Sequence, residues 1–114
     1  MNGTIVRHLP LTESTCYILL ALSEPLHGYA LMQKVEAMSQ GTVKIGPGTL
    51  YTAFSTLEKD GLIVKVGETE RRKLYQLTPK GQSVLREHLR RLRIICAAGH
   101  AIGHLGALSE EGEV

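Results

Sequence analysis

Residues 46–81 contain the stretch that decides the fold, GPGTLYTAFSTLEKDGLIVKVGETERRKLYQLTPKG. Its opening Gly-Pro pair suits a helix start, because glycine can occupy the N-cap and proline the first helical position. The apolar residues that follow recur at helical spacing until an Asp-Gly pair, which ends a helix predicted for residues 47–60. Two short β-type runs then cover residues 62–66 and 73–77. The sequence therefore predicts a helix followed by a β-hairpin.

The segments on either side add three helices and a loop. Upstream, helices are predicted over residues 14–23, with Thr12 as N-cap, and over residues 28–39. Between the two β-type runs, the polar residues 67–72 are expected to form the hairpin loop. A Thr-Pro pair directly after the hairpin starts the longest helix, whose apolar face continues to about His104.

Three short helices, a β-hairpin and a long helix follow the element order of a winged helix-turn-helix. The predicted fold class is therefore mainly α with a β-hairpin (α+β). We predict a winged helix-turn-helix domain over residues 1–77 and a dimerisation helix over residues 78–106 that packs on the same domain. Residues 107–114 form an acidic tail that is expected to be disordered. The hairpin, residues 62–77, is called the wing below.

The composition fits one small soluble domain and excludes several classes of protein. The chain has 114 residues, is 43% hydrophobic and contains two cysteines, so a reduced, cytoplasmic protein without a disulfide framework is expected. The longest near-apolar run, residues 94–108, is too short and too polar for a membrane span, and no signal peptide is visible. The sequence carries no glycine-rich phosphate loop, no HExxH motif and no nucleophile elbow. We therefore predict neither an enzyme nor a cofactor.

The charge of the chain is unevenly distributed. The formal net charge is only +2, and residues 1–57 are neutral overall. Residues 71–93, in contrast, hold eight bases and one acid, which gives a local net charge of +7. A basic block beside a neutral half is typical of a protein that binds phosphates, although a solvated helix face is the competing interpretation.

The predicted helix 47–60 is the candidate DNA-reading helix. In a helix-turn-helix the second helix enters the major groove, and small hydroxyl side chains can contact base edges or phosphates there. The wing adds three consecutive bases, which are placed to reach the sugar-phosphate backbone or the minor groove. The alternative is that the hydroxyl groups are merely solvated. The predicted DNA-binding residues are Lys44, Thr49, Tyr51, Thr52, Ser55, Arg71, Arg72 and Lys73.

The chain carries four motifs in one order, HGYAL at 27–31, PGTLY at 47–51, LEKDGLI at 57–63 and YQLTPKG at 75–81. In this combination it resembles PadR-type transcriptional regulators, and its single C-terminal helix is similar to the shorter subgroup of that family. The resemblance implies a homodimeric winged-helix protein, usually a repressor, that releases operator DNA when it binds a small molecule. It also implies that Tyr51 and its neighbours lie at the DNA.

Two residues depart from the motifs of that family. Thr52 stands where the family often has a proline after the tyrosine, and Gly46 stands where a serine-like cap is common. The change at Thr52 alters the exposed face of the reading helix, so the operator sequence of other family members does not apply to this chain. The fold assignment is unaffected by either departure.

The long helix has an apolar row whose steps alternate between four and three residues, which is typical of a helix–helix seam. Gly99 and Gly103 continue the row and would let a second backbone approach closely. We expect this helix and the first predicted helix, from two protomers, to form one core; packing within one chain is the alternative. The predicted interface residues are Ile18, Leu22, Leu85, Leu89, Leu92 and Cys96.

Cys96, His100 and His104 recur every four residues on the same helix. Side chains at this spacing can share a transition metal. A cysteine in the seam and two histidines near the helix end is the simpler interpretation, and we predict no metal site.

The predicted function is a sequence-specific DNA-binding transcriptional regulator, acting as a ligand-responsive homodimeric repressor. Its predicted partners are a double-stranded DNA operator, a second copy of the chain and a small-molecule effector, with no membrane. Two alternatives remain: a winged-helix protein-interaction module without operator binding, and a small-molecule carrier with a cavity between the last helices. Because the chain has no tryptophan and only five aromatic residues, we expect a stacking pocket for flat ligands to draw on other residue types.

Overall fold

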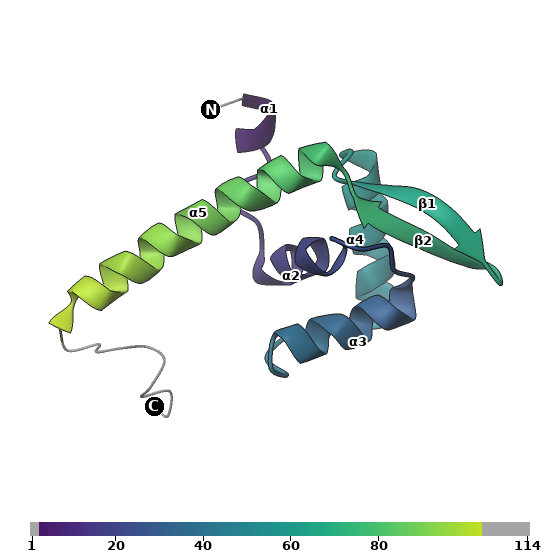
Figure 1. The fold of residues 1–114 in the computed structure, drawn as a ribbon, viewed down its shortest axis with the longest axis horizontal. Coiled ribbons are helices and arrows are strands. Elements are labelled where there is room, and N and C mark those ends of the chain that lie inside the picture. The colour runs from purple at the N-terminus through teal and green to yellow at the C-terminus, as the bar shows by residue number, and fades with distance from the viewer. Residues whose placement is uncertain (1–2, 104–114) are drawn as a thin grey trace.

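The computed structural model describes residues 3–103 and confirms the predicted fold class, helices with one antiparallel hairpin and a long last helix (Figure 1). In chain order the elements are α1 (Gly3–Val6), α2 (Glu13–Ala21), α3 (Gly28–Met38), α4 (Pro47–Lys59), β1 (Ile63–Thr69), β2 (Arg72–Leu77) and α5 (Pro79–Ala101). The predicted caps at Thr12, Gly46 and Thr78 are where the helices begin, and Thr12 accepts a hydrogen bond from the Thr15 N–H at 3.1 Å.

The ends of the chain differ most from the prediction. The single-turn helix α1 was not expected, since four residues carry too little periodicity to show in a sequence. Helix α5 ends at Ala101, three residues before the predicted end at His104. His104 and the acidic tail, residues 107–114, lie outside the described residues.

The wing is longer than predicted, and the prediction of a six-residue loop over 67–72 is wrong. Residues Gly67, Glu68 and Thr69 pair with Leu74, Lys73 and Arg72 across the hairpin. Backbone pairing thus continues through this polar segment, and the Glu68 carboxylate pairs with Lys65 of its own strand at 3.3 Å. The turn consists of Glu70 and Arg71 alone, whose φ angles of 51° and 68° match the positive values of a type I′ turn.

The core lies where α2, α3 and the first half of α5 meet the base of the wing. Its largest fully buried side chains are Ile18, Leu19, Leu22, Leu31, Val35, Leu62, Ile63 and Val84. The segment between α2 and α3 runs along β2, and its Leu26 exchanges both backbone hydrogen bonds with Tyr75, at 2.9 and 3.1 Å. These bonds tie the wing to the helix-turn-helix, which fixes the position of one relative to the other.

The start of α5 is locked onto the turn between α4 and β1. Thr78 donates a hydrogen bond to the Gly61 carbonyl at 2.7 Å and accepts one from the Gly81 N–H at 3.0 Å. A Cβ atom on Gly81 would lie 2.2 Å from the Leu62 carbonyl oxygen, so only glycine fits this crossing without a backbone shift. The LEKDGLI and YQLTPKG motifs, far apart in sequence, are thus two sides of one junction.

Helix α5 changes its surroundings along its length. In its first half, Gly81, Val84, Leu85, Glu87 and His88 are buried against the rest of the chain. From residue 92 onward the helix extends past α2 and away from the helical body (Figure 1). Every residue from 92 to 101 is exposed except Gly99, which is half-buried.

Candidate nucleic-acid interface

Helices α3 and α4 form the helix-turn-helix, and residues 39–46 connect them. Buried Ser39 organises this connection, because its hydroxyl accepts from the Val43 N–H at 3.0 Å and donates to the Val43 carbonyl at 3.2 Å. Val43 and Ile45 are buried, while Lys44 between them is exposed and lies 4.0 Å from a Glu36 carboxylate oxygen. The alternation places Lys44 on the outer surface just before α4.

The first turn of α4 is open at its N-terminus. Gly46 occupies the N-cap position and supplies no side-chain cap, so the first N–H groups of the helix keep their donor capacity. Such groups, together with the positive end of the helix dipole, attract phosphate oxygens.

The exposed face of α4 carries the predicted reading residues. Leu50 and Leu57 of α4 are buried, whereas Thr49, Tyr51, Thr52 and Ser55 are all exposed. The side chain of Tyr51 is 76% exposed, which is a large fraction for an aromatic residue of a single chain. The face is therefore available to a partner.

The three bases of the wing do not act as one group. Arg71 lies in the turn at the tip, while Arg72 and Lys73 are consecutive residues of β2. Consecutive side chains of a strand point to opposite faces of the sheet. Arg71 and Lys73 accordingly line the hollow beside α4, and Arg72 does not.

This hollow brings four of the predicted DNA-binding residues together. It is an open cavity of about 550 Å³ bounded by α3, α4 and β2. Tyr51 and Ser55 line it from α4, and Arg71 and Lys73 line it from the wing. One surface thus combines hydroxyl groups, an aromatic ring and two cations, the side-chain types that contact phosphates and base edges.

Thr49 and Thr52 lie on the other side of α4. They line a second hollow of about 510 Å³, together with Thr56 and with Thr15 from the first turn of α2. Lys44 borders neither hollow. The predicted site is therefore split by α4 into a wing side and an α2 side.

Sequence reasoning missed several residues of this surface. Tyr29, 63% exposed at the start of α3, lines the wing-side cavity, and its hydroxyl accepts from the Gln33 amide at 3.3 Å. Phe54 and Tyr75 also line it, with their ring centroids 4.7 Å apart. The HGYAL and YQLTPKG motifs contain two of these residues, but nothing in the sequence shows that they converge.

The base of the cavity holds a neutral phenol. The Tyr75 hydroxyl donates to a Glu58 carboxylate oxygen at 3.5 Å. Burial, followed by the charge and hydrogen bond of Glu58, raises the pKa of the Tyr75 phenol. The hydroxyl group of Tyr75 therefore stays protonated at neutral pH. Arg71 and Lys73 are the only cationic residues among those that line the cavity.

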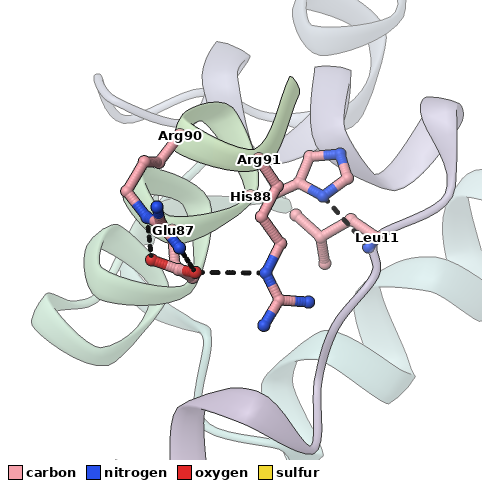
Figure 2. A network of polar contacts seen from close by, with 5 residues as sticks. All are labelled: Leu11, Glu87, His88, Arg90 and Arg91. Atoms are coloured by element: carbon pink, nitrogen blue, oxygen red, sulfur yellow. Dashed lines mark hydrogen bonds and ion pairs between the residues drawn. The ribbon is translucent and has the colours of Figure 1, made fainter. Parts of the chain in front are cut away.

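The basic block of residues 71–93 is not one patch. Its second part lies on α5, where Arg90 and Arg91 both turn toward Glu87 (Figure 2). Arg90 donates to the two carboxylate oxygens at 2.9 and 2.8 Å, and Arg91 donates at 3.1 Å. The hydrogen bonds from Arg90, the largest influence, and from Arg91 lower the pKa of Glu87 to about 2 against the opposing effect of burial. These two arginines are thus engaged within the chain, next to His88, whose Nδ1 accepts from the Leu11 N–H at 3.3 Å.

The predicted interface residues fall into two groups. Ile18, Leu22 and Leu85 are at most 8% exposed in the single chain, because α2 packs against both α3 and α5. They are core residues of the single chain and leave almost no surface for a second chain. Leu89 is half-buried, whereas Leu92 and Cys96 are exposed.

Two further predictions concern metals and membranes. Cys96 and His100 lie on the exposed half of α5, whereas the third proposed ligand, His104, lies outside the described residues. Residues 3–103 hold no group of three or more His, Cys, Asp or Glu side chains arranged to bind a metal ion. Within the same residues, no helix is both long enough and apolar enough to span a membrane.

Comparison with known proteins identifies the family. The profile of the transcriptional regulator PadR-like family matches residues 18–87, well over half of the chain. The chain therefore belongs to the PadR-like family of transcriptional regulators, whose members are not enzymes.

Individual relatives agree with this assignment. The transcriptional regulator Rv3488 of Mycobacterium tuberculosis is 36% identical over 75 residues, 63% of this chain and 67% of that protein. An uncharacterised 37.1 kDa protein in transposon Tn4556 of Streptomyces fradiae is 39% identical over 74 residues, which are 64% of this chain and only 21% of that protein. The crystal structure of a PadR family transcriptional regulator from Eggerthella lenta superposes with a TM-score of 0.63 at 30% identity, covering 75% of this chain and 76% of that one.

Proposed function

We propose that this PadR-like regulator is a ligand-responsive homodimeric repressor that binds a double-stranded DNA operator through α4 and the wing. The observation that carries the proposal is the convergence of Tyr51, Ser55, Arg71 and Lys73 on one exposed surface. In the proposed complex α4 enters the major groove, and the wing contacts the adjacent backbone.

In the proposed complex, the wing and the N-terminus of α4 contact phosphates, and the exposed side chains of α4 contact bases. Arg71, Arg72 and Lys73 neutralise phosphates, because their cationic side chains are exposed and none of them has an ion-pair partner among the described residues. The free N–H groups at the start of α4 add phosphate contacts. The side chains that face the bases are those of Thr49, Tyr51, Thr52 and Ser55. Lys44, which precedes α4 in the chain, contacts the DNA backbone.

A homodimer suits this arrangement, since two-fold symmetry would place two α4 helices about one DNA turn apart, roughly 34–36 Å. The surface for it is the exposed half of α5. Leu92 and Ile95 are 37% and 64% exposed there, and Ile102, directly after the helix, is 45% exposed, so apolar surface is left in contact with water. The proposed seam uses Leu89, Leu92, Cys96 and Gly99.

The test of DNA binding compares two double variants with the same loss of charge. Arg71→Ala/Arg72→Ala removes two cations at the tip of the wing, and Arg86→Ala/Arg93→Ala removes two from α5. Duplex DNA obtained by selection from a random library is titrated by fluorescence anisotropy at several salt concentrations. We expect the wing variant to lose about tenfold or more in DNA affinity. The slope of the logarithm of the binding constant against the logarithm of the salt concentration should fall by about one for each phosphate contact removed.

The α5 variant is the matched control, and we expect it to change affinity by less than about threefold. Its charges lie away from α4, and exposed charges are screened beyond a Debye length of about 8–10 Å. Equal losses in both variants would reject the wing assignment. Binding of the wild-type chain to no duplex at all would favour the protein-interaction module instead.

A further inference from the structure

We propose that the cavity between α3, α4 and the wing binds a small molecule with a flat apolar ring and one anionic group. We further propose that this ligand and DNA cannot bind at the same time. The competition with DNA rests on the proposed function, whereas the ligand site itself does not. The proposal locates an effector site on the DNA-facing surface.

The cavity gathers most of the aromatic side chains of the chain. The sequence has four tyrosines and one phenylalanine. Four of these five line this single cavity, namely Tyr29, Tyr51, Phe54 and Tyr75, and only Tyr17 does not. Tertiary packing thus concentrates the few rings at one place, so a stacking pocket here would not need other residue types.

The arrangement of these rings suits a flat ligand. Phe54 and Tyr75 contact each other at the inner side, with Tyr75 only 8% exposed. Tyr29 and Tyr51 rise from two different helices and are 63% and 76% exposed, so their ring faces are open to a ligand. Aromatic faces favour offset stacking with another planar group, and ligand cavities are mostly apolar with a few polar groups that set orientation. A volume of about 550 Å³ is within the range of small-molecule sites.

The charges at the rim select an anion. Arg71 and Lys73 reach the cavity from the wing, and the one acid that lines it, Glu58, already accepts the hydrogen bond of Tyr75. The guanidinium group of Arg71 can hold a carboxylate or sulfonate through two parallel N–H donors. Arg71 lies in the two-residue turn of the wing and lines the cavity.

The same residues make binding exclusive. Tyr51, Ser55, Arg71 and Lys73 line the cavity and belong to the proposed DNA surface. A ligand anion that engages Arg71 and Lys73 replaces the phosphate that these cations would otherwise neutralise. A bound ring would also occupy the space between α4 and the wing. The ligand would then release DNA by direct competition, without changing the distance between the two α4 helices of a dimer.

The first experiment titrates the full chain with 2-naphthalenesulfonate and follows the ring protons of the five aromatic residues by NMR. We expect the resonances of Tyr29, Tyr51, Phe54 and Tyr75 to shift together with one dissociation constant. Tyr17 is the internal control and should not shift. If Tyr17 shifts equally, or if none of the four rings moves, the site does not exist.

Variants then test the two components of the site. Ser55→Leu places an apolar side chain in the cavity and should weaken binding at least tenfold, whereas Thr56→Leu, outside this cavity, should leave it within twofold. Arg71→Gln should weaken binding of the sulfonate at least fivefold and leave that of 2-naphthalenemethanol, a neutral analogue, unchanged. Equal affinity of the wild-type chain for the sulfonate and the alcohol would overturn the assignment of an anion.

The last experiment measures competition on a labelled duplex, after binding of that duplex has been established without ligand. We expect saturating 2-naphthalenesulfonate to lower the apparent DNA affinity at least tenfold in the wild-type chain and not in Ser55→Leu, after correction for its own DNA affinity. Simultaneous binding of both would reject the exclusion. A chain that binds no DNA but shows the four ring shifts would reject the proposed function and keep the ligand site.

Discussion

The two halves of α5 share one continuous helical backbone and have opposite surroundings. The first half is fixed to the chain by buried side chains and by the junction of Thr78 with Gly61. The second half exposes Leu92, Ile94, Ile95 and Cys96 and contacts little of the body. An apolar stripe on a helix therefore identifies a surface to be covered, whereas the fold decides which part of it the same chain covers.

The largest expected effect is a loss of folding stability when one methyl group is added in the first half of α5. Gly81→Ala places a Cβ atom 2.2 Å from the Leu62 carbonyl oxygen, so the crossing of α5 and the α4–β1 turn must open. We expect a loss of about 3 kcal/mol in the free energy of unfolding, measured by urea denaturation. A loss below about 1 kcal/mol would show that the junction yields easily.

In the second half, the next largest effect should come from a charge in the proposed seam. Cys96→Glu puts like charges opposite each other in a homodimer and should raise its dissociation constant about 100-fold or more, as measured by sedimentation equilibrium. Ile94→Glu is the matched control, because Ile94 is 54% exposed on the same half but lies off the seam. An equal effect of both variants would place the interface elsewhere on the helix.

The Glu87 network, which lies near the boundary of the two halves, predicts a dependence on pH. Its carboxyl has a pKa of about 2 in the folded chain against 4.5 for an ordinary glutamate, so its stabilisation is complete above pH 4.5 and is lost as the pH falls toward 2. Glu87→Gln should lower Tm at pH 7, and its difference from the wild type should shrink between pH 4.5 and 2.5. Circular dichroism melts at three pH values test this. A difference that stays constant with pH would contradict the network.

The smallest effect is expected for the same methyl group placed in the other half. At Gly99, no atom of residues 3–103 lies within 4 Å of the added Cβ apart from the two neighbouring residues and the adjacent backbone of α5 itself. Gly99→Ala should therefore raise the stability of the isolated chain by up to about 1 kcal/mol through helix propensity. If a second helix approaches closely at Gly99, the variant weakens the dimer instead, and comparing melts at low and high protein concentration separates the two outcomes.

The elements of the wing show where local reasoning was insufficient. Hydrophobic periodicity predicts the hairpin and its place in the chain, whereas the polar composition of residues 67–72 predicts a loop. Pairing of Glu68 with Lys73 extends both strands through this region. Cross-strand pairs form between residues that a local window treats separately, so the length of a two-stranded ribbon depends on its register.

The order and type of the elements from α2 onward, the caps at Thr12, Gly46 and Thr78, and the family of the protein all follow from the amino-acid sequence. These features depend on residues a few positions apart, whose propensities and hydrogen bonds act locally. Tertiary packing sets three further features: Ile18 and Leu22 are core residues, Gly81 must be glycine, and four of the five rings meet beside Arg71 and Lys73. Those outcomes follow from how α2, α4, α5 and the wing pack against each other, and packing places residues from distant parts of the chain within contact distance.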